Sequence, residues 1–449
     1  MSAAGGLRRA TLVAYGAPGL AAAIPVIPVA VLLPTWYARD LGLGFALTGL
    51  VLALARVLDF LADPLIGLLT DRRGWGGLRY KPWVLAGALL AGFGMALLAR
   101  PPATVGAVHL AVGAVCLFVG WSLFTIPYTA WGAELSDDVH ERSLVAAARE
   151  LAGLVGMLVA LALPALLVLN LGDAAPAPFA VLAVAAGVLG VPAIAALLLR
   201  VPEPEPGTRA THGEVAWRDF VALLRVPDCR RTLVCWFVNG IANGLPAVLF
   251  PLVVSDWLSL AERDTFLLLA CYFGAAVGGA PLWLALARRY GKTPAWRIAI
   301  AVNVVVFAQV AWLGPHNAAW FYLVCLLSGL TLGADLALPP SIQADVLAAD
   351  RAASGRRRTA SAFALWTMAT KLALALAVAV AFIGLGADAA PAAGAATAID
   401  PARLLVGYVG LPVLLKLSLL VLLRTPLETP SGPHREAPPE RAQHAAEQG

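Results

Sequence analysis

The chain has 449 residues, of which 60% are hydrophobic and only 13% are Asp, Glu, Lys or Arg, and its mean hydropathy is +0.81. A soluble globular protein has about 45–50% apolar and about 25% charged residues, so this composition excludes a soluble enzyme and indicates a membrane protein with several spans. The formal net charge of +5 does not indicate nucleic-acid binding, because the basic residues lie in short segments between apolar runs.

Twelve apolar runs are long enough for helices that cross a bilayer, which needs about 20 residues each. The first six are Leu12–Pro34, Phe45–Thr70, Trp83–Ala99, Val105–Trp131, Leu144–Leu169 and Phe179–Leu199. The next six are Thr232–Ser255, Thr265–Ala287, Trp296–Leu313, Ala319–Leu338, Thr359–Leu385 and Leu404–Leu423. The runs are continuous and do not alternate with period two, so we expect an all-α polytopic membrane protein.

The basic residues gather in alternate loops, which predicts an even number of spans with both termini in the cytoplasm. We expect four regions: an N-terminal six-helix bundle (1–199), a cytoplasmic central loop (200–231), a C-terminal six-helix bundle (232–424) and a disordered cytoplasmic tail (425–449). Within the central loop, Trp217–Leu224 is compatible with a short helix on the membrane surface. The expected location is the cell inner membrane.

The second apolar run carries Arg56, Asp59 and Asp63, which fall on one face of a helix. Each charge near the bilayer centre costs about 2.5–3.5 kcal/mol, so this face must meet partners or a water-filled cavity. One interpretation is an ion pair that only holds helices together. The other is a cation-coupling site, because hard cations prefer carboxylate oxygens and Asp59 and Asp63 at i, i+4 can reach one ion.

Several sequence motifs are spread across the chain. The second run ends in GLLTDRRGW and the eighth in ALARRYGKTPAW, which indicates a weak repeat of six plus six spans. GLLTDRRG is similar to the G-x-x-x-D-R-x-G loop of the major facilitator superfamily. Together with LARVLDFLADPLIG, RYKPW, IPYTAWGAELSDDVHER and LPPSIQADVLAADRAASGRRR, it makes the chain resemble the glycoside–pentoside–hexuronide:cation symporter family, the melibiose permease-like branch of that superfamily.

That resemblance implies a twelve-helix fold and roles for particular residues. Asp59 and Asp63 would bind the coupling Na⁺, Li⁺ or H⁺, Arg149 would contact the substrate, and Lys371 would lie near the same site. Three family positions depart from the pattern: an acid of the first helix falls at Ala23, an acid of the fourth at Thr125, and a sugar-packing tryptophan at Thr129, with Trp131 two residues on. These departures weaken both galactoside recognition and Na⁺ binding.

The coupling ion stays open between Na⁺ and H⁺, and no other cofactor is expected. Asp59 and Asp63 would be the metal ligands for Na⁺, with Thr125 assisting. Two close carboxylates raise each other's proton affinity, so one of them can hold a proton at neutral pH. Because Thr125 replaces an acid, we favour H⁺.

The remaining polar residues inside the runs each have two interpretations. Arg149 is either a substrate contact or a residue anchored at the headgroups, and Lys371 is either a substrate contact or a counter-charge for the acids. Asn239 and Asn243 form either part of a sugar pocket and gate or a satisfied interhelical hydrogen bond. Asp335 is expected to pair with Lys371 or with the basic cluster Arg356, Arg357 and Arg358, whereas Lys416 has no evident partner.

Asp71, Arg72 and Arg73 are predicted to form a cytoplasmic charge cluster that latches one state of a rocking cycle. The leading hypothesis is a secondary active transporter that couples H⁺ or Na⁺ to symport of a sugar, glycoside or hexuronide-like solute. The pocket's excess of basic residues favours an anionic solute. The alternative is a transporter of a lysolipid or other amphiphile. The expected partners are a small-molecule solute and the lipid bilayer, with no nucleic acid and a monomeric state. The spans contain no nucleophile–base or metal motif, so an enzyme is not expected.

Overall fold

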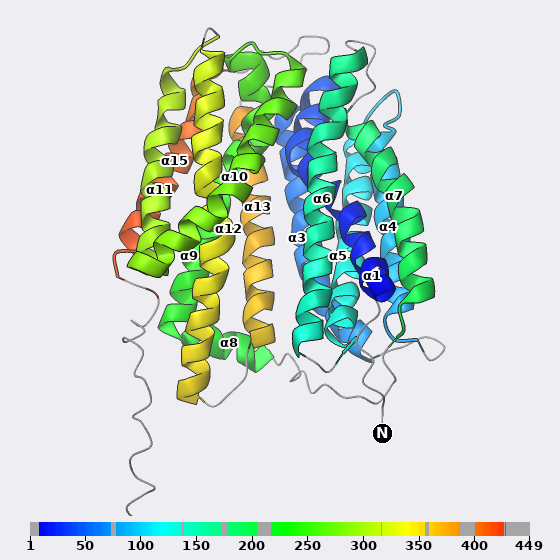
Figure 1. Ribbon diagram of the computed structural model, residues 1–449. Helices are drawn as coiled ribbons and strands as arrows, with labels where there is room; N and C mark the ends of the chain where they lie inside the picture. The colour runs from blue at the N-terminus through cyan, green and yellow to red at the C-terminus, as the bar shows by residue number, and fades with distance from the viewer. Residues whose placement is uncertain are drawn as a thin grey trace, which may run out of the picture.

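The computed structural model describes residues 9–72, 78–136, 139–171, 178–203, 217–315, 317–354, 359–386, 400–425 and 427. Its elements are all helical and form two bundles that stand side by side (Figure 1). The predicted fold class, an all-α membrane protein with the two-bundle architecture, is therefore confirmed.

The first bundle contains the N-terminal half of the chain. Its elements are α1 (Arg9–Ala23), η1 (Pro28–Leu32), α2 (Leu33–Thr35), η2 (Trp36–Asp40), α3 (Phe45–Arg72), α4 (Lys81–Ala99), α5 (Ala107–Ala133), α6 (Val139–Leu171) and α7 (Pro178–Arg200). The elements from α1 to η2 form one continuous span, Arg9–Asp40. Pro25, Pro28 and Pro34 lack the amide that the helical ladder needs, which accounts for the change from α to π geometry along this span.

The second bundle follows a short helix, α8 (Trp217–Arg225), which lies where the sequence predicted one. Its elements are α9 (Pro227–Leu252), η4 (Val253–Trp257), α10 (Glu262–Tyr290), α11 (Lys292–Ala308), η5 (Gln309–Trp312), α12 (Ala318–Ser354), α13 (Thr359–Gly386), α14 (Pro401–Leu405), η6 (Val406–Gly410) and α15 (Leu411–Leu422). Gly291 joins α10 to α11 at a φ of 90°, a conformation that glycine adopts without strain.

Eleven helical segments in the described part of the chain are long and apolar enough to cross a membrane. The 33-residue α6 is a further long helix and packs against α1 in the first bundle. Large apolar side chains such as Leu89, Val191 and Leu199 are exposed on the outside of the protein. In lipid these side chains need no burial, because the acyl chains around them are as apolar as they are.

Small residues allow close packing inside the first bundle. Gly94 of α4 lies against the backbone of Leu117, and Gly120 of α5 lies against the backbone of Ala91. A Cβ at either glycine would collide with the facing backbone, so any other residue would force α4 and α5 apart. This small-residue contact replaces the hydrophobic driving force that soluble helices use, because lipid offers none between helices.

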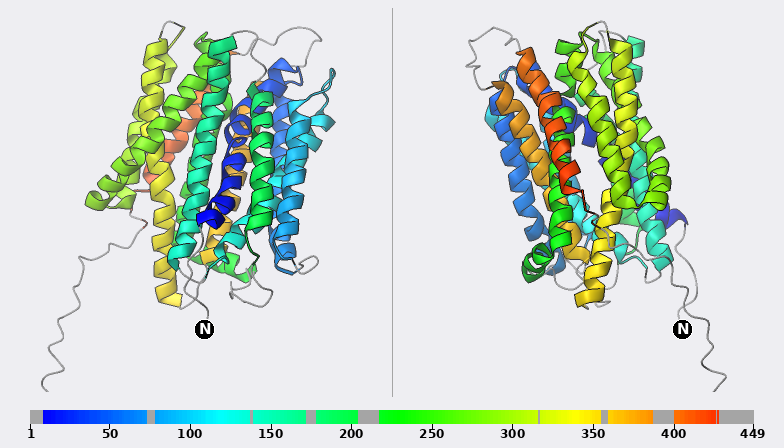
Figure 2. Two further views of the ribbon diagram at one scale, coloured as in Figure 1. Left: turned by 45° about the vertical axis from the view of Figure 1, so that its right-hand side comes forward. Right: turned by 90° about the vertical axis from the view of Figure 1, so that its left-hand side faces the viewer.

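The two bundles meet along paired helices, with α3 beside α13 and α6 beside α10 (Figures 1 and 2). Phe45 of α3 and Phe382 of α13 place their ring centroids 5.5 Å apart in the hydrophobic core that both bundles share. Both described ends of the chain, at the start of α1 and after α15, lie toward the lower side of the molecule in Figure 1, where Arg231 at the start of α9 donates to the carbonyls of Leu422 and Thr425. We call this the terminal side.

Candidate coupling site

Three charged side chains meet between the bundles, midway along α3 and α13. Lys371 Nζ of α13 donates to Asp63 Oδ1 and Oδ2 of α3, at 2.8 and 2.7 Å. The same ammonium lies 3.0 Å from Asp59 Oδ2, one turn back along α3. The sequence placed both carboxylates on one helix face, and in the structure that face meets the other bundle. Lys371 is thus a counter-charge for both acids, which was one of its two predicted roles.

Ser122 of α5 completes this centre. Its hydroxyl donates to Asp59 Oδ1 at 2.7 Å and accepts from Lys371 Nζ at 2.7 Å. We name Asp59, Asp63, Lys371 and Ser122 the interbundle centre. The sequence analysis missed Ser122 and named Thr125, which lies one turn further along α5 and forms no hydrogen bond with a described residue. The available signal was that Ser122 is a polar residue on the helix face that also carries Thr125.

Burial makes the charges of the interbundle centre significant. Asp59 is almost fully buried, while the side chains of Asp63 and Lys371 keep exposed fractions of 13% and 18%. Two carboxylates face one ammonium, so the three groups carry a formal charge of −1. Arg56 on α3 offsets this charge without pairing with the carboxylates, so their only described ion-pair partner is Lys371 and a further cation can compete for their oxygens.

Arg56 lies next to this centre without joining it. Its guanidinium carbon is 3.7 Å from the centroid of the Phe118 ring of α5, a cation–π contact. It forms no ion pair with a described residue, although Asp59 is only one turn away on α3. Arg56 therefore contributes positive potential near the carboxylates while leaving their oxygens to Lys371 and Ser122.

Arg149 and Thr129, both predicted substrate contacts, lie together on the terminal side of the first bundle. Arg149 Nη1 of α6 donates to Thr129 Oγ1 of α5 at 2.9 Å, and Arg149 Nη2 lies 2.7 Å from Glu150 Oε1. About a quarter of the Arg149 side chain is exposed. Arg149 can therefore reach a solute only by giving up some of its contacts with Thr129 or Glu150.

Trp131 is fully buried in the core of the first bundle. Its indole Nε1 donates to the carbonyl of Pro202 at 2.9 Å, and the Lys81 ammonium lies over its ring. The ring therefore offers no free face on which a sugar could stack, and its contacts stabilise the terminal end of the bundle. Of the predicted charge cluster, Arg73 lies outside the described residues, and Asp71 and Arg72 end α3 with side chains that are likewise outside them.

A second buried pair of opposite charges lies inside the C-terminal bundle. Lys416 Nζ of α15 is 3.1 Å from Asp335 Oδ2 of α12, and it also donates to Asn239 Oδ1 of α9 at 2.7 Å. Asn243 Nδ2 donates to Asp335 Oδ2 at 2.9 Å, and Trp296 Nε1 donates to Asp335 Oδ1 at 2.7 Å. We name these five residues the intrabundle cluster.

The intrabundle cluster corrects the expected partner of Asp335. The sequence analysis paired this acid with Lys371 or with the basic residues 356–358, but its partner is Lys416, which had none assigned. Lys371 is taken up by the acids of α3. Asn239 and Asn243 lie together, as the i, i+4 spacing predicted, and both contact charged groups.

One further contact ties the bundles together on the side opposite the termini. Arg39 Nη1 of η2 lies 2.6 Å from Asp256 Oδ1 of η4 and donates to Ser255 Oγ at 3.0 Å. On the terminal side, the described ion pairs stay within one bundle, as for Arg79 with Glu134. The described residues contain no group of three or more metal-ligating His, Cys, Asp or Glu side chains.

Three proteins are similar to this chain in sequence. Escherichia coli K12 has YagG, described as a glycoside/cation symporter, which is 23% identical over 360 residues (76% of this chain, 75% of YagG). The inner membrane symporter YicJ of the same organism is 32% identical over 135 residues, or 29% of each chain. The Synechocystis symporter sll1374 is 29% identical over 204 residues, which cover 43% of this chain and 37% of that one.

Solved structures show the same architecture. The nucleoside transporter NupG aligns with a TM-score of 0.68 at 12% identity, covering 93% of this chain and all of NupG. A proton-dependent oligopeptide transporter aligns with a TM-score of 0.67 at 15% identity, covering 93% of this chain and 97% of that structure. The model of the MFS/sugar transport protein family matches residues 14–429. The chain therefore belongs to the MFS/sugar transport family and is a multi-pass membrane transporter, as its sequence motifs predicted.

Proposed function

We propose that the protein is a cation-coupled symporter that carries a sugar-like solute by alternating access between its two bundles. The observation that carries this proposal is the bond between Lys371 of α13 and both Asp59 and Asp63 of α3. Buried charges in a membrane protein are costly and mark ion pathways. This centre also joins the two bundles through charged groups at mid-height of α3 and α13.

The geometry supplies a mechanism for coupling. The ammonium of Lys371 occupies the position between the carboxylates that a coupling cation would take. When a cation binds there, it competes with Lys371 for the oxygens of Asp59 and Asp63 and weakens the contact between α3 and α13. Each half of the rocking motion then depends on whether the cation is bound, which is the requirement for coupled transport.

We propose H⁺ as the coupling ion. A proton on Asp63 removes one carboxylate charge and needs no additional volume beside the ammonium. Na⁺ would need several oxygen ligands, and Lys371 already occupies the space between the acids. Ser122 can then donate to the carboxylate that remains charged.

The contacts between the bundles also support a proposal for which side of the molecule is closed and which side faces the cytoplasm. Arg39 and Asp256 join the bundles on the side opposite the termini, so we propose that this state is closed there and opens on the terminal side. The excess of Arg and Lys in the loops on the terminal side supports a cytoplasmic location for both termini, in the cell inner membrane. We propose that one chain is the transporting unit, because one chain contains both bundles.

Uptake into proteoliposomes tests this proposal. The solutes are neutral methyl glycosides, hexuronates and lysolipids, each with an imposed H⁺ or Na⁺ gradient. We expect a sugar-like solute to accumulate only with the H⁺ gradient, and Asp63→Asn to abolish accumulation while exchange without a gradient continues. Asp345→Asn is the matched control, because Asp345 forms an exposed ion pair with Lys292 within one bundle.

Two results would contradict the proposal. Full uphill accumulation by Asp63→Asn would show that the carboxylate of Asp63 on α3 is not needed for coupling. Movement of lysolipids, with no gradient-driven uptake of any sugar or uronate, would instead support the amphiphile transporter that the sequence analysis kept as its alternative.

A further inference from the structure

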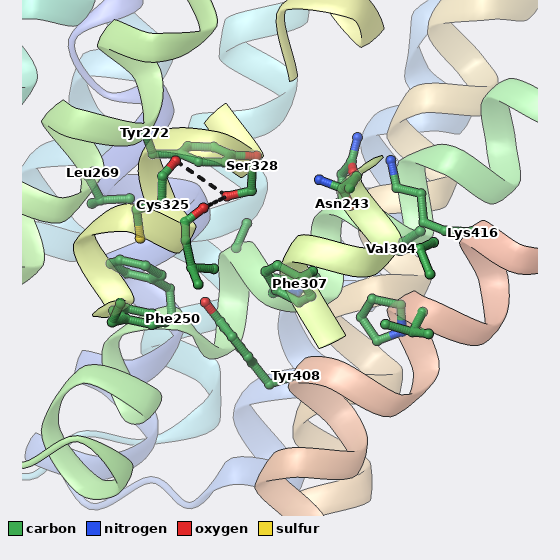
Figure 3. Close-up of a pocket in the computed structure, with 18 of the residues that line it drawn as sticks. Asn243, Phe250, Leu269, Tyr272, Val304, Phe307, Cys325, Ser328, Tyr408 and Lys416 are labelled. Atoms are coloured by element: carbon green, nitrogen blue, oxygen red, sulfur yellow. Dashed lines mark hydrogen bonds between the residues drawn. The ribbon is translucent and has the colours of Figure 1, made fainter. Parts of the chain in front are cut away.

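A cavity of about 80 Å³ lies inside the second bundle, between α9, α10, α11, α12 and α15 (Figure 3). One water molecule needs about 10–15 Å³ by the same kind of measure, so the cavity has room for more than a single water. Val31 of η1 is the only one of its described lining residues that comes from the first bundle. The cavity therefore reaches the surface along which the two bundles meet.

The two ends of this cavity differ in chemistry. Asn243 and Lys416, from the intrabundle cluster, lie side by side at one end (Figure 3). Phe250, Phe307 and Tyr408 supply aromatic walls toward the other. A few polar groups at one end of a mostly apolar, aromatic pocket are typical of sites for small organic ligands.

Several polar groups at the cavity have hydrogen-bonding capacity left over. Lys416 donates to two groups in the described structure, and an ammonium has three N–H donors. The hydroxyls of Tyr272 and Tyr408, which line the cavity, form no hydrogen bond with a described residue. Buried donors are nearly always satisfied in proteins, so these groups are suited to bond with the polar atoms of a ligand.

The charge of the cluster restricts what that ligand can be. Asp335 and Lys416 balance each other, and Asp335 accepts hydrogen bonds from Lys416, Asn243 and Trp296. An anionic ligand would leave one unbalanced negative charge in this buried place, and a cationic ligand one positive charge. A neutral ligand whose oxygens accept from the free donors adds no charge.

We propose that this cavity is a subsite for a neutral, polyhydroxylated ring, the chemistry of an uncharged sugar or glycoside. Its hydroxyls would bond to Lys416, Asn243 and Tyr272, and its C–H face would lie against Phe250 or Phe307. The ring would enter past Val31 when the bundles part. This inference rests on the proposed transport function and names its solute class, in place of the anionic solute that charge counting from the sequence favoured.

Equilibrium binding to the purified full-length protein tests the subsite, without any ion gradient. The probes are methyl β-D-xylopyranoside, methyl β-D-glucopyranoside, methyl β-D-galactopyranoside and D-glucuronate, measured by calorimetry. Val413 of α15 lines the cavity, so Val413→Phe should fill it. Leu414→Phe is the matched control, because the Leu414 side chain next to it is 63% exposed on the outer surface.

We expect at least one neutral glycoside to bind the native protein and Leu414→Phe equally, and Val413→Phe about tenfold or more weaker, while D-glucuronate does not bind. The double variant Asp335→Leu/Lys416→Met removes both charges together, so it should fold and yet lose binding. Its thermal unfolding curve shows whether it has folded. The subsite is overturned if Val413→Phe or the folded double variant binds with native affinity, if only D-glucuronate binds, or if no glycoside binds.

These outcomes are separate from the test of symport. Asp63→Asn keeps the cavity intact and should bind the glycoside while losing gradient-driven uptake. Glycoside binding as described, with no uptake driven by any gradient, would overturn the symporter and leave the subsite standing. Gradient-driven uptake of a solute that Val413→Phe still binds would overturn the subsite and leave the symporter standing.

Discussion

Two buried Asp–Lys groups in this protein differ in where they lie and in how their charges balance. The interbundle centre joins α3 to α13 across the interface between the bundles and sets two carboxylates against one ammonium. The intrabundle cluster joins α12 to α15 within one bundle and pairs one carboxylate with one ammonium. The side chain of Lys371 is 18% exposed, and that of Lys416 is 4% exposed.

The difference shows what each group is suited to do. The interbundle centre has more carboxylates than ammonium groups and some contact with solvent, which suits it to the exchange of a cation. The intrabundle cluster is balanced, enclosed and well bonded, so it is suited to holding a fixed shape and presenting polar groups to a neutral ligand. We therefore propose that similar residue types serve for coupling in one place and for solute recognition in the other.

The largest expected effect on stability comes from breaking the balanced cluster. Lys416→Met leaves Asp335 as an uncompensated buried charge, which costs about 3–5 kcal/mol of folding free energy. The double variant Asp335→Leu/Lys416→Met should recover most of that loss. Denaturant unfolding in detergent, followed by tryptophan fluorescence, measures both. Equal stability of Lys416→Met and the native protein would show that the Asp335–Lys416 pair is not buried as described.

Removing the ammonium from the unbalanced centre should cost less. Lys371→Met leaves two carboxylates together, but one can take up a proton from the partly exposed side, so we expect a loss of about 1–3 kcal/mol. Uphill uptake should be lost even where the protein is folded. The same unfolding assay and proteoliposome uptake measure the two effects. A loss larger than that of Lys416→Met would reverse the comparison between the two groups.

Ser122 offers a finer test of the interbundle centre. Ser122→Ala removes one hydrogen bond to Asp59, worth about 0.5–1.5 kcal/mol, so the apparent affinity for the coupling cation should change by about two- to tenfold. The dependence of the uptake rate on cation concentration gives this affinity. Thr125→Val, on the same face of α5, is the control and should leave it unchanged. The opposite pattern would restore Thr125 as the residue that assists the acids.

The smallest effect belongs to the contact between Arg39 and Asp256. Exposed ion pairs contribute about 0.2–1 kcal/mol, so Arg39→Gln should shift the balance between the two open states by about fivefold at most. A cysteine is placed at the interface between the bundles on the side opposite the termini. The rate at which it is labelled, compared between Arg39→Gln and the protein that keeps Arg39, measures this shift. A complete switch to the other state would show that this pair, and not the interbundle centre, controls the transition.

The sequence was sufficient for the features that depend on neighbouring residues. Continuous apolar runs predicted the spans, and the i, i+4 spacing placed Asp59 and Asp63 on one face of α3. Motifs across the chain also identified the family. Each of these signals lies within a short stretch of the chain or in a set of such stretches.

The partners of the charged residues were beyond the sequence. Lys371 and Asp63 are 308 positions apart, and no local pattern says which helix faces α3. For the same reason Asp335 was given the wrong partners, because Lys416 on α15 becomes its neighbour only when the second bundle folds. Ser122 was missed because its place on the Thr125 face of α5 does not by itself show which of the two hydroxyls is hydrogen-bonded.

The central claim is that the coupling cation binds the α3 carboxylates and not the balanced pair in the second bundle. Infrared difference spectra between acidic and alkaline conditions, recorded without any solute, observe the protonated carboxyl directly. The account predicts a carboxyl band in the native protein and in the folded Asp335→Leu/Lys416→Met variant, and its loss in Asp59→Asn/Asp63→Asn. A band that persists in Asp59→Asn/Asp63→Asn and disappears in Asp335→Leu/Lys416→Met would contradict it.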